Sequence, residues 1–141
     1  MPGPELGRGG RPMLEPVRGL RVVAEPAALD GARWSGDGPV VLRSAPDEAF
    51  AIDATAVELS DGHAIVVEER GWVGVRLDPD ELAESVAARL DWVLPAARPA
   101  LAQGSLVGIP AKLWLAADGG ALVVVQAVYA DELADRLGWR R

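Results

Sequence analysis

His63 is the only histidine in the chain, and histidine is the side chain best suited to acid–base catalysis near neutral pH. Asp61 precedes it by two residues in the stretch SDGHAIVV, and a carboxylate can orient an imidazole. The chain has no cysteine, and Ser60 is too near in sequence to make a persuasive nucleophile. The interpretation that we favour is a histidine at the start of a strand, with Asp61 and Gly62 supplying turn geometry.

The carboxylates form groups that could serve catalysis or bind a metal ion. Acid–base catalysis needs two carboxyl groups that converge on one cleft in unequal environments. The four groups are Asp47-Glu48, Glu68-Glu69, Asp78/Asp80-Glu81 and Asp131-Glu132. Three of the four flank turns or helix starts, where turn or capping chemistry explains them. With no cysteine, one histidine and no glycine loop of the phosphate-binding kind, the sequence predicts neither a metal site nor a cofactor.

The stretch LDWVLPAARPALAQGSLVGIPAKLWL, residues 90–115, raises a second question. Its part from 95 to 110 is predicted to be an apolar loop, and the backbone groups of such a loop still need hydrogen-bond partners. Arg98 and Gln103 suit that work, so we favour them as fastenings of the loop. The alternative hypothesis is a pocket wall, with Arg98, Gln103 and Trp92 binding an anionic small molecule and His63 as the base.

Five tryptophans are many for 141 residues, and most lie near a turn or the end of an element. In the stretch RGWVGVRL, Val73 and its alternate neighbours share one face of a predicted strand, whereas Trp72, Gly74 and Arg76 share the other. Tryptophan and arginine are enriched at interface hot spots. We therefore predict that Trp72 and Arg76 contribute to a protein interface.

Composition excludes several classes of function. The net charge is −7, and residues 1–23 carry a balance of +2, so the remainder is strongly acidic and nucleic-acid binding is not expected. We find no signal-peptide pattern, and the apolar run from Ser105 to Ala130 is interrupted by Lys112 and a DGG turn, which predicts two strands, not a membrane span. We expect a cytoplasmic protein.

The elements predict an α+β fold, mainly an antiparallel sheet with two helices on one face. Residues 1–16 are predicted to be a flexible Pro/Gly-rich arm, and residues 17–141 a single domain. A hairpin at 63–77 is predicted to lead into a helix at 78–94, and a hairpin at 111–126 into a short closing helix. Both helices start with Asp-Glu-Leu-Ala and reach Arg-Leu and a tryptophan, so a ββα-ββα internal repeat is one interpretation and chance is the other.

These observations favour a non-catalytic domain that acts through protein association, as a homodimer or as an accessory subunit. The expected partner is a second copy or another protein. The alternative is a small-molecule binding domain or a minor enzyme that uses the 95–110 loop. The two hypotheses differ in surface: a flat apolar patch favours association, and a deep pocket that Arg98 enters favours a ligand.

Overall fold

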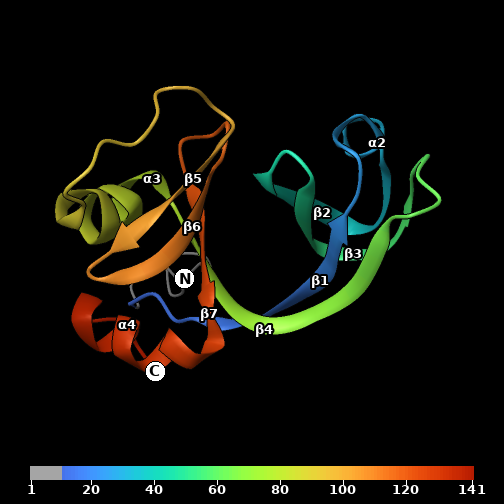
Figure 1. Ribbon diagram of the computed structural model, residues 1–141. Helices are drawn as coiled ribbons and strands as arrows, with labels where there is room; N and C mark the ends of the chain where they lie inside the picture. Colours follow the sequence, from blue (N-terminus) through green and yellow to red (C-terminus); the bar gives the residue numbers. More distant parts are fainter. Residues whose placement is uncertain (1–10) are drawn as a thin grey trace, which may run out of the picture. The chain divides into compact units, whose positions relative to one another are not determined.

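The computed structural model describes residues 11–141, whose contacts divide the chain into two compact units. One unit is Pro16–Trp72, and the other contains Val73–Arg141 with the N-terminal segment up to Glu15. The chain is mainly antiparallel sheet with a few short helices, as predicted for an α+β fold (Figure 1). Most of the predicted arm lies outside the described residues. The single domain over 17–141 stays a prediction, because one strand contributes residues to both units.

The unit Pro16–Trp72 has the strand order β2-β3-β1-β4. Its elements are β1 (Glu15–Val23), α2 (Pro26–Asp30), β2 (Arg33–Ala45), β3 (Glu48–Glu58) and the first part of β4 (Ile65–Leu77). Strands β2 and β3 form an antiparallel hairpin closed by the pair Ala45 and Glu48, and β3 also pairs antiparallel with β1. Small and aliphatic side chains fill the core of this unit: Leu20, Val22, Ala24, Ala28, Leu29, Ala49, Ala51 and Ala54.

The predicted hairpin over 63–77 is wrong, because β4 is one uninterrupted strand from Ile65 to Leu77. A tight reversal at Glu-Arg-Gly would need a left-handed backbone, and Gly71 is not among the residues with positive φ. The polar side chains instead bond along the strand. Arg70 pairs with Glu68 at 3.1 Å, two residues away and therefore on the same face.

The unit that contains Val73–Arg141 has the strand order β4-β7-β6-β5. Its strands are the last part of β4, β5 (Ala100–Leu106), β6 (Ile109–Leu115) and β7 (Ala121–Gln126). The hairpin around the DGG turn is confirmed as β6 and β7, but the predicted loop from 95 to 110 is largely strand. A two-residue turn joins β5 to β6, with φ of 44° at Val107 and 86° at Gly108.

The helix after β4 begins as predicted and ends early. Asp78 accepts the backbone N–H of Glu81 while the Glu81 side chain accepts the N–H of Asp78, a reciprocal cap at the start of α3 (Pro79–Glu81). The chain then continues as a π-helical segment, Leu82–Val86, and a 3-10 turn, Ala87–Arg89. The predicted end at Leu94 is therefore wrong. Arg89 donates to the carbonyls of Glu84 and Ser85, both at 3.0 Å, so its own side chain satisfies the last carbonyls.

The closing helix α4 (Ala130–Leu137) follows a 3-10 turn at Ala127–Tyr129 and ends at Gly138, whose φ is 71°. Leu82 and Val86 from the first helical segment share one core cluster with Leu133 and Leu137 from α4, together with alternate residues of β6 and β7. Because β4 is a single strand, the segment before the first helix lacks the hairpin that the second has. The internal repeat stays a prediction. Among the described residues, no helix is long and apolar enough to span a membrane.

Candidate functional site

The segment between the first helix and β5 is fastened by its own side chains. The indole N–H of Trp92 donates to the carbonyl of Ser105 at 2.8 Å, and the Trp92 ring covers Gly104, where an added Cβ would lie 2.8 Å from the ring. Arg98 donates to the carbonyls of Pro95 and Ala97, at 2.5 and 2.9 Å. The bonds of Arg98 to backbone carbonyls are of the kind that the sequence predicted for it, whereas the Trp92 bond was not predicted.

Gln103 lies on β5 directly opposite Lys112 on β6. The ammonium of Lys112 donates to Oε1 of Gln103 at 2.5 Å, a cross-strand pair. Trp92, Arg98 and Gln103 thus belong to the unit that contains Val73–Arg141, whereas His63 belongs to the other. A ligand site built from these four residues stays a prediction.

The side chain of Asp61 contacts the backbone of His63. Asp61 Oδ1 accepts the backbone N–H of His63 at 2.8 Å, and Asp61 Oδ2 accepts the backbone N–H of Glu25 at 2.9 Å. These two N–H donors, with Glu25 the stronger cause, hold the pKa of the Asp61 carboxyl below its usual value of 3.8. The carboxylate therefore acts as a clamp between the turn at 61–63 and the start of α2.

Trp72 is half-buried within its own unit. Its ring lies 5.9 Å from that of Phe50, with a tilt of 40°, and its indole N–H donates to Glu69 Oε1 at 2.8 Å. Arg76, the other predicted interface residue, is exposed on the same strand. The interface role of both stays a prediction, and Trp72 additionally packs the strand against β3.

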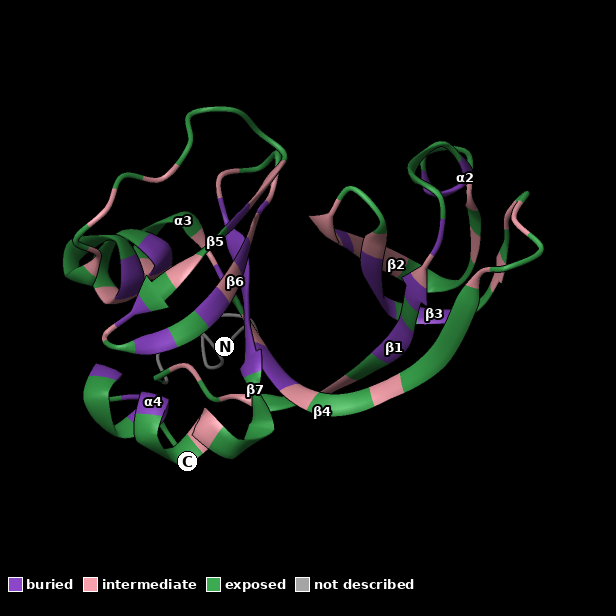
Figure 2. Cartoon of the chain, viewed as in Figure 1, coloured by how far each residue is buried: buried purple, intermediate pink, exposed green. Residues whose placement is uncertain are grey.

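The first residues of β4 form an exposed apolar segment. Ile65, Val66 and Val67 are 58, 44 and 39 % exposed. Figure 2 colours much of β4 in this unit as exposed. Successive side chains of a strand point to opposite faces, so neither face of β4 is covered here. Three adjacent β-branched apolar residues exposed on a strand are the kind of feature that marks an association surface.

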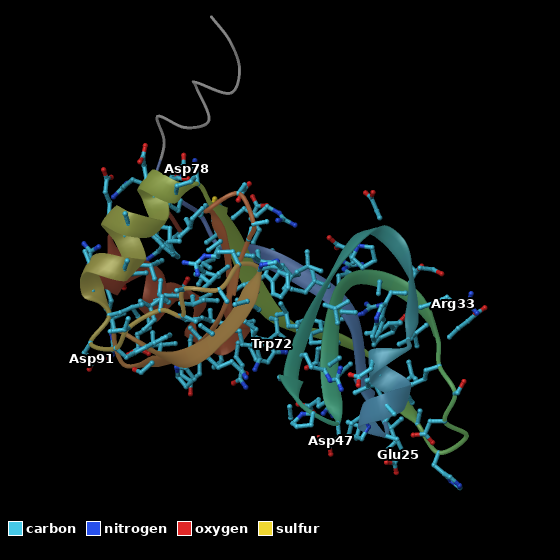
Figure 3. All side chains as sticks on the ribbon, turned by 90° about the horizontal axis from the view of Figure 1, so that it is seen from above. Glu25, Arg33, Asp47, Trp72, Asp78 and Asp91 are labelled. Carbon is cyan, nitrogen blue, oxygen red and sulfur yellow. The ribbon has the colours of Figure 1, made fainter. Side chains whose placement is uncertain are left out.

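A shallow depression of about 600 Å³ lies beside this segment, on the side of Ile65. Val23, Pro26, Pro46 and Ile65 give it apolar surface, and its acidic lining residues are Glu25, Asp47 and Asp61. Figure 3 shows Glu25 and Asp47 together at one end of this unit. No lysine or arginine of the described residues lines it, so its charge is negative.

A second depression, of about 400 Å³, differs in charge. Its four carboxylates, Asp37, Asp53, Glu68 and Glu69, share the lining with Arg18 and Arg70, so the two arginines compensate half of the negative charge. Within the described part of the chain, no group of three or more histidine, aspartate or glutamate residues is arranged to hold a metal ion.

Comparison with known proteins adds no family to this description. No family model and no curated protein matches the chain. The function must therefore be inferred from the geometry of the surface.

Sequence reasoning missed the exposed segment at Ile65–Val67. The hairpin predicted over 63–77 made these residues the first arm of a strand pair, whereas the structure extends them along one strand. One signal was available. The run Ile-Val-Val is followed at once by Glu68 and Glu69, and charged residues beside an apolar run are a common protection for an exposed strand.

Proposed function

We propose that this chain is a non-catalytic protein-association domain that forms a homodimer through the first part of β4. The exposed segment Ile65–Val67 carries the proposal. Fully burying an exposed valine gains roughly 1.5–3 kcal/mol. Val66 is 44 % exposed, so burying the rest of it gains roughly half as much in each copy, and the two copies in a dimer together lower the dissociation constant by about tenfold.

The charges around Val66 fit a second copy of the same chain. By the alternation of a strand, Val66, Glu68, Arg70 and Trp72 share a face. In a twofold interface, if residue i contacts residue j of the partner, then j also contacts i, so Glu68 and Arg70 can form two reciprocal ion pairs across the interface. The side chains of Glu68 and Arg70 are 73 and 67 % exposed, so their pairing within the chain is weak and can be exchanged.

A stable interface buries roughly 800 Å² on each partner, more than Val66 and Val67 can supply. Trp72 is the residue of this unit that would extend the contact along β4. Trp72 is a poor first probe, because replacing it also removes the Phe50 contact within the chain.

Sedimentation velocity over a micromolar concentration series tests the proposal. Wild type is expected to sediment as a dimer, and Val66→Asp as a monomer. Val93→Asp is the matched control, because it makes the same chemical change at a valine that is 92 % exposed in the other unit. Val66→Ile should keep the dimer.

A monomeric wild type throughout the series would overturn the proposal. A dimer that both Val→Asp variants weaken equally would overturn the placement of the interface. Circular dichroism of each variant shows whether the fold is retained.

A further inference from the structure

The depression on the side of Ile65 has a preformed wall. Three segments meet there: the end of β1 with the start of α2, the β2–β3 turn, and the turn before β4. The backbone N–H of Ala24 donates to the carbonyl of Asp47 at 3.0 Å, which ties the first two together. Asp61 ties the first to the third through the N–H groups of Glu25 and His63. A site whose walls are already bonded needs little ordering when it binds.

Its apolar surface is available to a ligand. Ile65 is 58 % exposed, and Pro26 and Pro46 are exposed beside it. Prolines and a β-branched residue lose little freedom when they are covered, so contact with an apolar side chain is favourable here.

The lining of the depression is negative, although the guanidinium of Arg43 donates to the backbone carbonyls of Pro26 and Pro46 at its edge. Pro16–Trp72 contains five arginines and ten aspartates and glutamates, which leaves −5 of the chain's −7. Four of the five arginines pair with carboxylates outside the depression: Arg21 with Glu48, Arg33 with Glu58, Arg43 with Asp30 and Arg70 with Glu68. Among the described residues, no hydrogen bond or ion pair engages the carboxylates of Glu25 and Asp47.

We propose that this depression binds a basic segment of a partner protein, with an apolar side chain against Ile65 and lysine or arginine side chains beside Glu25, Asp47 and Asp61. The same negative charge repels the phosphates of nucleic acids and of anionic lipids. The apolar surface distinguishes the site from one for a small cation, which would gain nothing from Ile65.

This site is separate from the proposed dimer interface. Ile65 and Val66 point to opposite faces of β4, and the depression is lined by Ile65 and not by Val66. The two proposals can therefore fail independently.

The test is a fluorescence-anisotropy titration with a short synthetic peptide of alternating lysine and leucine, labelled with a dye. The wild type is expected to bind it with a dissociation constant below about 1 mM at low salt, and more weakly as salt is added. A lysine–serine peptide of the same charge should bind at least several-fold more weakly, because it lacks the apolar side chains.

Variants locate the binding. The double variant Glu25→Gln/Asp47→Asn should weaken binding roughly three- to tenfold, as expected for two partly exposed ion pairs. Ile65→Ser should weaken binding of the lysine–leucine peptide and leave the lysine–serine peptide unchanged. Asp37→Asn is the matched control, since it removes a carboxylate of the same unit that lines the other depression.

Three results would overturn the proposal: no binding of the lysine–leucine peptide, equal binding of both peptides, or an effect of Asp37→Asn as large as that of Glu25→Gln/Asp47→Asn. Val66→Asp should bind the peptide with the same dissociation constant as the wild type. Peptide binding and dimer formation are thereby tested separately.

Discussion

Asp61 joins two parts of the chain that are 36 residues apart in sequence. Each of its carboxylate oxygens accepts one backbone N–H, from Glu25 and from His63. A carboxylate with two such donors is favoured in its ionised form, which lowers the pKa of Asp61.

The lowered pKa makes a pH-dependent prediction for Asp61→Asn. A carboxyl whose folded pKa is depressed contributes stability above its unfolded pKa, and this contribution is lost as the pH falls through the folded pKa. The melting temperature of the wild type should exceed that of Asp61→Asn by a constant difference from neutral pH to about pH 5. This difference should shrink below about pH 4. Thermal melts at a series of pH values measure it. A margin that is independent of pH, or that grows in acid, would contradict the clamp.

The turn at residues 61–63 could be predicted from the sequence, but the contact of Asp61 with Glu25 could not. Asp-Gly before a strand indicates a turn, and the N–H of His63 indeed bonds to Asp61. Nothing local indicates that the second oxygen meets Glu25, because that contact depends on how β1 and β4 are paired.

At the scale of elements, Trp92 and Gly104 hold the segment before β5 in place. A methyl group at Gly104 would lie 2.8 Å from Cζ2 of Trp92, closer than carbon atoms can approach without displacement. The indole is also held by its bond to Ser105, so it has little room to move.

Gly104→Ala should therefore destabilise the chain by about 1–3 kcal/mol in urea unfolding. The cost should fall in a Trp92→Ala background, because the clash is then absent, and the double-mutant cycle measures this coupling. Gly71→Ala in β4 is the control, since an added Cβ there meets nothing within 4 Å. Equal costs with and without Trp92 would show that the ring does not constrain Gly104.

Local chemistry predicted where these elements begin better than where they end. Asp78, Pro79 and Glu81 fix the start of the first helix through capping, which is a short-range interaction. Its end was placed at Leu94 because Pro95 forbids continuation, whereas Arg89 and Trp92 end it earlier through contacts with backbone carbonyls. The β5–β6 hairpin was missed because its turn places Val107, a β-branched residue, at positive φ.

At the scale of the whole molecule, the negative charge is concentrated in Pro16–Trp72, the unit that also exposes Ile65, Val66 and Val67. The excess of acid could be predicted from composition, and negative charge of this kind repels polyanions. The exposed strand could not, because only the pairing of β4 decides which of its residues are left uncovered. The association proposed here depends on that strand.

Chemical cross-linking gives the most direct measurement of this claim. The chain has no cysteine, so Val66→Cys introduces a single thiol and Val93→Cys provides the matched control. With a short bifunctional maleimide at micromolar protein concentration, Val66→Cys should form a covalent dimer in buffer but not when the reaction is run in urea, and Val93→Cys should remain monomeric in both. Equal cross-linking of the two variants, or no dimer from Val66→Cys, would contradict association through β4.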